Sequence, residues 1–351
     1  MMESPSSLDT IAVPSPDVPE KEVLDLLLRE YGLQGNLTQL VSERDQNFRV
    51  DATDGRQFVV KIVSSAEPAQ ITDFQIQALL HLAASACTVA VPRLVRTRTG
   101  ATTSNIQTAD ASNVLRVVSY VPGRPVEGTV PGPGLAYSMG QCLAKLDLAL
   151  SDFSHAGESQ VLLWDMQRAS ELRELMTHIS DPELRSTTHT CLDDFEERAA
   201  PLFPALRTQV IHNDLNPGNV LITDTAPATV VGVIDFGDML RAPLIVDVAI
   251  AAAYLRSTDD DALAATQALV AGFDSIVPLE DRECELLFDL IRMRLATTIT
   301  ILHWRKSARS EEDAYLKKSL RQQSPEHFLR IINGIARRGF ADRVLISKKS
   351  Y

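Results

Sequence analysis

Two polar segments, each directly behind a short apolar run, most restrict what this chain can fold into. The first, HNDLNPGN at 212–219, follows the run QVI, and the second, DFGD at 235–238, follows the run VVGVI. An apolar run that stops at polar and turn-forming residues is typical of a buried strand that ends in a loop. The spacing therefore predicts two strand–loop units, whose loops carry Asp214, Asn219 and Asp235.

These three side chains match what phosphoryl transfer needs. In that reaction a carboxylate accepts the proton of the attacking hydroxyl, and oxygen ligands hold the Mg²⁺ that neutralises the phosphates. Asp214 is the predicted base, and Asn219 and Asp235 are the predicted magnesium ligands. His212 is expected to brace the loop by hydrogen bonding. In the plainer interpretation these are turn residues only, but the two segments together favour the chemistry.

The composition is that of a globular chain long enough for two lobes. Of 351 residues, 45% are apolar and 23% are charged, and the net charge is −12. An acidic chain disfavours nucleic acid as a partner and suits a small cationic substrate. The four cysteines form no CxxC pair, which argues against zinc. No signal peptide and no membrane span is predicted, so we expect a cytoplasmic protein without a membrane partner.

The pattern of apolar residues predicts an α+β fold with a small β-rich first lobe and a larger helical second lobe. A disordered tail is expected at 1–21 and a first lobe at 22–121, with a β-hairpin around Asp54-Gly55. The second lobe, 122–338, is expected to be mainly helical, and 339–351 to be loose. Its expected helices span 137–150, 169–178, 182–200, 246–256, 261–273, 281–304 and 324–338.

The first lobe offers candidates for nucleotide binding, although it has no GxGxxG and no Walker A sequence. Lys61, in the middle of a predicted strand, is expected to hold the phosphates, and Asn47 to contact them from a turn. Asp73, with Glu67 as the alternative, is the predicted acidic partner of Lys61. The backbone of Ser119 and Val121 is expected to bind the base.

The two motif segments resemble those of the aminoglycoside phosphotransferase and choline kinase superfamily, and the resemblance covers about residues 22–338. It implies a protein-kinase-like two-lobe fold that uses ATP or GTP with Mg²⁺. Asp247, in the stretch LIVDVA, matches a downstream aspartate of that superfamily that is implied to anchor the catalytic loop.

Three short stretches are most similar to the hydroxylysine kinase group, which implies 5-hydroxylysine as acceptor and GTP as donor. They are DQNF at 45–48, LWD at 163–165 and DFGDM at 235–239. Where another group of the superfamily has a histidine, this chain has Asp147.

We expect the substrate's ammonium to pair with Asp165 and to pack on Trp164 by a cation–π contact. Asp238 would add negative charge beside the metal loop. The alternative for residues 164 and 165 is a buried tryptophan and a helix-capping aspartate.

Other acceptors and one other class of function stay open. A kinase for choline, ethanolamine, homoserine or an aminoglycoside has the same motifs, and so could a non-catalytic nucleotide-binding pseudokinase. The intact set of Lys61, Asp214, Asn219 and Asp235 argues for catalysis. The sequence leaves the donor, the acceptor and the oligomeric state undecided.

Overall fold

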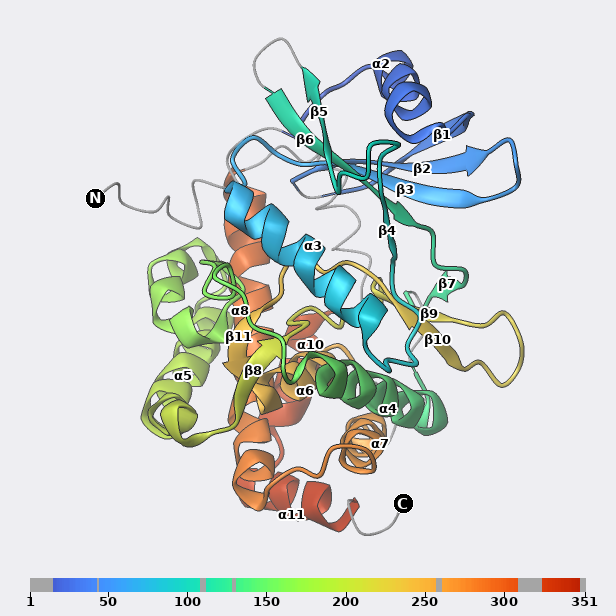
Figure 1. Ribbon diagram of the computed structural model, residues 1–351. Coiled ribbons are helices and arrows are strands. Elements are labelled where there is room, and N and C mark those ends of the chain that lie inside the picture. Colours follow the sequence, from blue (N-terminus) through green and yellow to red (C-terminus); the bar gives the residue numbers. More distant parts are fainter. Residues whose placement is uncertain are drawn as a thin grey trace. The chain divides into compact units, whose positions relative to one another are not determined.

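The computed structural model describes residues 15–42, 44–107, 112–127, 131–256, 261–308 and 324–347. These residues form two compact units (Figure 1). The first unit contains the chain up to Ser85, together with Val91–Val121 and His155–Val161. The second contains Ala86–Ala90, Pro122–Ser154 and the chain from Leu162 onward. The short segment at 155–161 thus belongs to the first unit, although the sequence analysis placed it in the second lobe.

The first unit is built on an antiparallel sheet with the strand order β1-β2-β3-β6-β4, and β5 also pairs with β6. The predicted hairpin is confirmed: β2 and β3 pair across Asp54-Gly55, where Gly55 has φ 84°. The strands span Gly35–Leu40 (β1), Gln46–Ala52 (β2), Gln57–Ile62 (β3), Leu94–Val95 (β4), Ser104–Gln107 (β5) and Ser112–Ser119 (β6).

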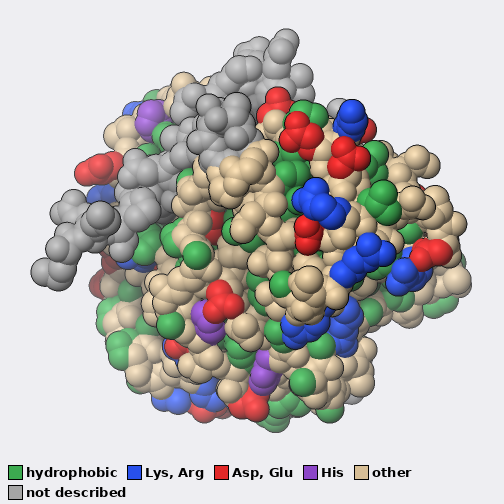
Figure 2. All heavy atoms as spheres, turned by 45° about the horizontal axis from the view of Figure 1, so that its top comes forward, with side chains coloured by type: hydrophobic (Ala, Val, Ile, Leu, Met, Phe, Trp, Pro, Cys, Tyr) green, Lys and Arg blue, Asp and Glu red, His purple; other side chains and the backbone are tan. Residues whose placement is uncertain are grey.

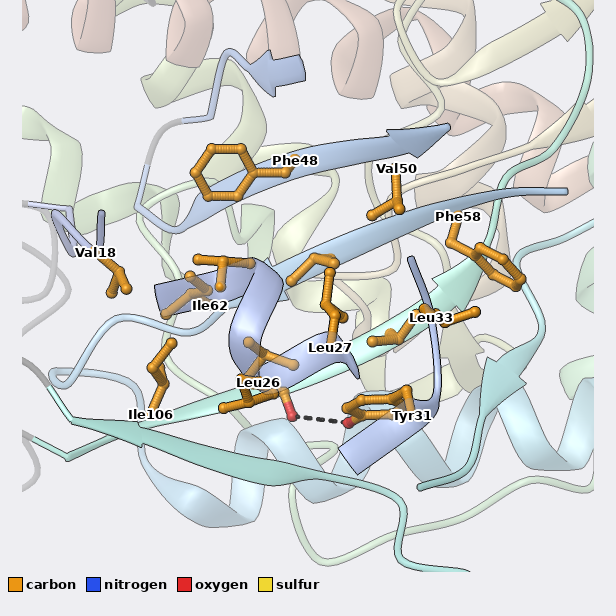
Figure 3. Packing of buried hydrophobic residues seen from close by; sticks show 14 residues of the cluster. Val18, Leu26, Leu27, Tyr31, Leu33, Phe48, Val50, Phe58, Ile62 and Ile106 are labelled. Carbon is orange, nitrogen blue, oxygen red and sulfur yellow. Dashed lines mark hydrogen bonds between the residues drawn. The ribbon is translucent and has the colours of Figure 1, made fainter. Parts of the chain in front are cut away.

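One face of this sheet carries the core of the first unit (Figure 3). Phe48, Val50, Val60 and other alternate residues of β2, β3 and β6 are buried there, as the period of two in a strand requires. The helix α2 (Glu20–Leu26) and the π-helical turn η1 (Leu27–Tyr31) supply the opposing apolar residues.

The first unit is ordered from before residue 22, where the sequence analysis placed the start of the lobe. The Gln46 side chain accepts the backbone N–H of Val18 at 2.8 Å and donates to its carbonyl at 3.1 Å. Val18 is buried in the core, which explains why the predicted tail does not extend this far. Residues 1–14 of that tail lie outside the described residues.

The second unit is mainly helical, as predicted. Two differences concern its helices: residues 166–178 form two 3₁₀ turns in place of an amphipathic α-helix, and the chain is helical as far as Ser347. Phe340, expected in a loose tail, is buried against Phe288. The helices are α4 (Pro133–Leu150), η2 (Met166–Arg173), η3 (Leu175–His178), α5 (Pro182–Arg198), η4 (Ala200–Ala205), α6 (Leu244–Ala253), α7 (Ala264–Asp274), α8 (Asp281–Ala308), α10 (Pro325–Asn333) and α11 (Arg337–Ser347).

Two small sheets of the second unit hold the motif loops. β8 (Thr208–Ile211) pairs with β11 (Leu240–Pro243), and β9 (Val220–Ile222) pairs with both β10 (Val230–Val233) and β7 (Arg124–Pro125). The first predicted loop runs from β8 to β9, and the second runs from β10 to β11. The two strand–loop units expected from the sequence are therefore confirmed.

Two further observations concern the exterior. On the face in Figure 2, acidic and basic side chains lie next to one another. None of the helices in the described part of the chain is both long enough and apolar enough to cross a membrane.

Candidate active site

His212 links the two motif loops. It is buried directly after β8, and its Nε2 lies 3.2 Å from the carbonyl oxygen of Ile234, the residue before Asp235. Its Nδ1 accepts the backbone N–H of Asp214 at 3.3 Å. One ring nitrogen thus faces an acceptor and the other a donor, which is the pattern of a neutral imidazole with the proton on Nε2. Burial also lowers the pKa of His212, so the ring serves as a neutral brace between the loops.

Asp247, on the first turn of α6, fixes the backbone of the catalytic loop. Its carboxylate accepts the N–H groups of His212 and Asn213, each at 2.9 Å. Asn213 has φ 63°, a left-handed conformation that a non-glycine residue adopts only when its surroundings hold it there. Its side chain donates to the carbonyl of Asp238 at 3.0 Å and so joins this loop to the second one. These hydrogen bonds fit the expected role of Asp247 as the anchor of the catalytic loop.

Asp147, on α4, is a second buried carboxyl group beside Asp247, and no role was predicted for it. Neither of its carboxylate oxygens receives a hydrogen bond from the described residues. Burial and the adjacent Asp247 raise the pKa of Asp147 well above its usual range. Because two backbone N–H groups favour the ionised form of Asp247, the proton shared by the pair resides on Asp147. The sequence signal was a single acidic residue in an otherwise apolar helix segment.

The predicted base, Asp214, is held by two asparagines. The side-chain amides of Asn216 and Asn219 each donate to its Oδ2 at 2.8 Å, and its Oδ1 lies 3.6 Å from the guanidinium of Arg294. Burial and the charge of Asp238 raise the pKa of Asp214 to about 8, although Arg294 and Asn216 act in the opposite direction. A carboxyl group fixed in this way, with its side chain 21% exposed, can accept a proton in its ionised form, which the raised pKa favours only above about pH 8.

Asn219 and Asp235 lie at the same end of the β9–β10 hairpin, because Ile234 donates its backbone N–H to the Asn219 carbonyl at 2.9 Å. Both amide hydrogens of Asn219 go to Asp214, which leaves its Oδ1 as a possible metal ligand. Asp235 has φ 63°, and its side chain is exposed. An amide oxygen and a carboxylate are ligands that suit a hard cation such as Mg²⁺, so this pair fits the predicted metal.

The region of the predicted substrate residues differs from expectation. Guanidinium groups already lie over the Trp164 ring, that of Arg294 at 4.9 Å and that of Arg305 at 5.5 Å from the centroid. Asp165 caps η2 by accepting the backbone N–H of Gln167 at 2.9 Å. The capping alternative therefore describes Asp165, and the cations on Trp164 argue against an ammonium there.

In the first unit, the phosphate candidates lie in one row across the sheet. Asn47 on β2 pairs in register with Lys61 on β3, and Lys61 with Arg116 on β6. Asn47 was expected in a turn but lies within the strand, on the face opposite the apolar core. Its Oδ1 is buried and has no hydrogen-bond partner among the described residues. The three side chains therefore form a polar row that includes two cations.

The helix α3 (Ala69–Ala84) presents Gln75, and not Asp73, to this row. Gln75 accepts a hydrogen bond from Arg116 and donates to Glu67 at 3.3 Å. The Asp73 carboxylate is 55% exposed, lies 3.1 Å from His155 Nε2, and accepts a bond from Gln77. These partners differ from the predicted pairing of Asp73 with Lys61.

The predicted base-binding residues lie at the end of the Val91–Val121 segment of the first unit. Ser119 exchanges backbone and side-chain hydrogen bonds with Arg93, and Tyr120 donates its N–H to the Gln57 carbonyl. No hydrogen bond to the backbone of Val121 is found within the described ranges. The base-binding role of Ser119 and Val121 stays a prediction.

The fold and this arrangement define a class: a protein-kinase-like small-molecule phosphotransferase with a hydroxyl acceptor. The model of the phosphotransferase enzyme family matches residues 36–284, and the chain belongs to that family.

Curated relatives are similar over most of their length. A hydroxylysine kinase of Danio rerio is 24% identical over 324 residues, which cover 88% of this chain and 91% of the relative. A hydroxylysine kinase of Xenopus laevis is 26% identical over 328 residues, which cover 86% of each chain.

Solved structures share the fold at low identity. An amicoumacin kinase in complex with AMP-PNP, Ca²⁺ and its ligand has a TM-score of 0.66 at 16% identity, covering 90% of this chain and 94% of its own. A microcompartment-associated aminopropanol kinase has a TM-score of 0.64 at 16% identity, with coverage of 93% and 99%. The predicted two-lobe kinase-like fold is thereby confirmed.

Proposed function

We propose that this protein transfers the γ-phosphoryl group of ATP or GTP to a hydroxyl group of an amine-bearing metabolite, with 5-hydroxylysine as the first candidate acceptor. The observation that carries the reaction type is the Asp214 carboxylate, fixed by Asn216 and Asn219 next to the loop that bears Asp235. The acceptor rests on the hydroxylysine kinases that resemble the chain over about nine tenths of its length. A cytoplasmic location remains a prediction of the sequence alone.

In the proposed reaction, Asp214 orients the acceptor hydroxyl and takes its proton. A bond forms between the acceptor oxygen and the γ-phosphorus, and the bond from that phosphorus to the β–γ bridging oxygen breaks. The nucleoside diphosphate leaves with that electron pair. The transition state needs positioning and charge neutralisation more than covalent help, which explains a base held by three fixed neighbours.

Residues of the first unit would hold the donor nucleotide. Lys61 would contact the phosphates from the polar row, Asn47 would donate its side-chain amide hydrogens to them, and Ser119 and Val121 would offer backbone groups to the base. Asn219 Oδ1 and Asp235 would hold Mg²⁺, which supplies charge neutralisation to the phosphates when it is bound. The role of Asp73 as the partner of Lys61 stays a prediction.

A release assay for the nucleoside diphosphate tests this function. The assay would offer ATP and GTP with Mg²⁺ to 5-hydroxylysine, homoserine, choline, ethanolamine and kanamycin. We expect turnover that the Asp214→Asn variant reduces by at least about 1,000-fold, since a base and its charge are both lost. Asp224→Asn is the matched control: the residue lies between β9 and β10, its side chain is 84% exposed, and turnover should persist.

The alternatives give different results in the same assay. A kinase for choline, ethanolamine, homoserine or an aminoglycoside would leave 5-hydroxylysine unphosphorylated and act on its own acceptor. A pseudokinase would bind nucleotide without turnover of any acceptor. Turnover that is equal in the Asp214→Asn variant and in the wild type would disprove the assignment of the base.

A further inference from the structure

Three arginines gather around two aromatic rings of the second unit. The guanidinium of Arg294 lies 4.9 Å from the centroid of Trp164 and 5.8 Å from that of Tyr254. Arg305 lies over the same indole at 5.5 Å, and Arg256 over the same phenol at 4.9 Å. We call these five residues the arginine cluster. None of the three arginines is more than 5% exposed.

The helix α8 explains how two of these cations come together. Arg294 and Arg305 are three helical turns apart and therefore share one face of α8, beside the Trp164 ring. Arg256 follows α6, whose end brings Tyr254 to the same place. In the sequence these arginines are separate single charges, and no local pattern indicates that the fold brings them together.

Burying like charges together is unfavourable unless an anion lies among them. The anionic neighbours of Arg294 are Asp214, at 3.6 Å, and Asp238. Burial lowers the pKa of Arg256, and the positive charge of Arg294 lowers it further. The negative charge of Glu326 acts in the opposite direction. The two carboxylates near Arg294 are thus the proposed base, Asp214, and Asp238 of the metal loop. Both have another role in the proposed reaction.

Arg294 retains unused capacity to bind an anion. One terminal nitrogen donates to the carbonyl of Trp164 at 3.3 Å, and the other to the hydroxyl of Tyr254 at 3.4 Å. Its Nε is buried and has no partner in the part of the chain that the structure describes. A guanidinium presents Nε and a terminal nitrogen as a fork that matches the two oxygens of a carboxylate.

The position of the cluster is set by Asp214. In the proposed reaction the acceptor hydroxyl must contact this carboxylate, and Arg294 lies 3.6 Å from it. Any acceptor therefore comes within a few bonds of the cluster. A carboxylate of the acceptor that reaches Arg294 would be attracted by its guanidinium, whereas an ammonium next to the reacting hydroxyl would have to pair with the carboxylates of Asp214 and Asp238.

We propose that the arginine cluster recognises a carboxylate of the acceptor, so that the substrates of this kinase are hydroxy amino acids and not amino alcohols or polyamines. This inference rests on the proposed function and narrows it. Arg294 supplies the fork beside the base, and Arg256 and Arg305 supply the positive field around it. The sequence analysis expected a cation on Trp164 from the substrate; here the protein itself provides that cation.

Paired acceptors test the inference, because only the carboxylate differs within a pair. The pairs are 5-hydroxylysine with its amide and homoserine with its amide, and the readout is the ratio of kcat/KM between acid and amide. For the wild type we expect the acid to be favoured by about 10- to 100-fold for the acceptor that turns over, the range of a charge-assisted hydrogen bond. In Arg294→Gln and in Arg256→Gln, the ratio should fall toward one.

Arg292→Gln is the matched control on the same helix. Arg292 binds Asp194 at 2.6 Å and the Asn333 side chain at 2.7 Å, away from the cluster. The variant loses a buried cation and is expected to be less stable, yet its acid-to-amide ratio should equal that of the wild type. The ratio is independent of the amount of folded enzyme, so partial unfolding of any variant does not obscure the result.

The possible outcomes separate the inference from the function. If the wild type phosphorylates the amide as well as the acid, the inference is wrong while the kinase assignment stands. The inference is also wrong if both cluster variants keep the full preference. If the wild type phosphorylates none of these acceptors and none of the amino alcohols, the proposed function itself fails, and this inference with it.

Discussion

At the scale of single residues, the site depends on which oxygen or nitrogen atom of each side chain is not used in a hydrogen bond within the loop. Asn219 donates both amide hydrogens to Asp214, and its Oδ1 remains available for a metal. Asn216 donates to Asp214, and its Oδ1 accepts the backbone N–H of Gly218. Two asparagines in one loop therefore have different tasks. The motif predicted Asn219 as a metal ligand but did not single out Asn216, since that role follows only from the folded loop.

This difference can be measured with two alanine variants. Asn219→Ala should raise the Mg²⁺ concentration for half-maximal activity by about 10- to 100-fold, because a proposed ligand is lost. Asn216→Ala should lower kcat while leaving the Mg²⁺ requirement close to that of the wild type. Titration of activity with Mg²⁺ gives both values, and an equal shift in the two variants would contradict the division of tasks.

The buried Asp147–Asp247 pair makes stability depend on pH. Because the native pKa of Asp147 is raised, the folded state binds a proton that the unfolded chain releases above about pH 4. The free energy of unfolding should therefore fall as the pH rises through the range between the unfolded and the native pKa. The slope is at most about 1.4 kcal/mol per pH unit for one proton.

Asp147→Asn tests that prediction, since a neutral amide can still donate to Asp247. The variant should gain stability relative to the wild type as the pH is raised from about 4 to 8, measured by urea unfolding. Asp147→Ala, which cannot donate, should be destabilised by about 1 to 3 kcal/mol at low pH. A pH-independent difference between the wild type and Asp147→Asn would show that Asp147 is ionised in the fold.

At the scale of elements, two helices of the second unit meet backbone to backbone. A Cβ atom at Gly140 on α4 would lie 2.0 Å from the carbonyl oxygen of Leu269 on α7, and one at Gly272 would lie 2.1 Å from that of Tyr137. The crossing therefore requires glycine at both positions. It also fixes α4, the helix that carries Asp147 beside Asp247.

Gly140→Ala should force these helices apart and destabilise the protein by about 1 to 3 kcal/mol or more. The control is Gly134→Ala on the same helix, where a Cβ would meet no atom within 4 Å. That variant should be neutral or more stable by up to about 1 kcal/mol, because alanine favours the helix. Chemical unfolding of both proteins decides, and equal stabilities would disprove the close contact.

At the scale of the whole molecule, each unit contributes one part of the proposed chemistry. The polar row of Asn47, Lys61 and Arg116 belongs to the first unit, and the base, the metal ligands and the arginine cluster belong to the second. Binding of the nucleotide and turnover can therefore be separated by mutation.

Mg²⁺ with a non-hydrolysable nucleotide should raise the melting temperature of the wild type, since a ligand of the folded state stabilises it by mass action. The shift should persist in Asp214→Asn, because the base is not needed for binding. It should become small in Lys61→Met, which removes a cation from the row while keeping the aliphatic side chain. A full shift in Lys61→Met would argue against the proposed phosphate contact.

Local sequence patterns alone determined the two strand–loop units and the hairpin at Asp54-Gly55, and they supplied the candidates for the base and the metal ligands. Each of these depends on neighbours within a few residues, through strand periodicity, turn preferences and motif spacing. The end of the chain was predicted less well: Phe340 lies in a helix because it packs on Phe288, a contact that no local pattern reveals.

Only the tertiary structure decided which charges meet. It brings Arg294 to Asp214, Asp147 to Asp247 and Gln75 to Arg116, in each case between segments far apart in the sequence. The physical reason is that the burial and pairing of a charge depend on all the elements packed around it, whereas a strand or a turn depends on its own residues. The motifs thus indicated the reaction, and the packing of remote helices supplied the clue to the acceptor.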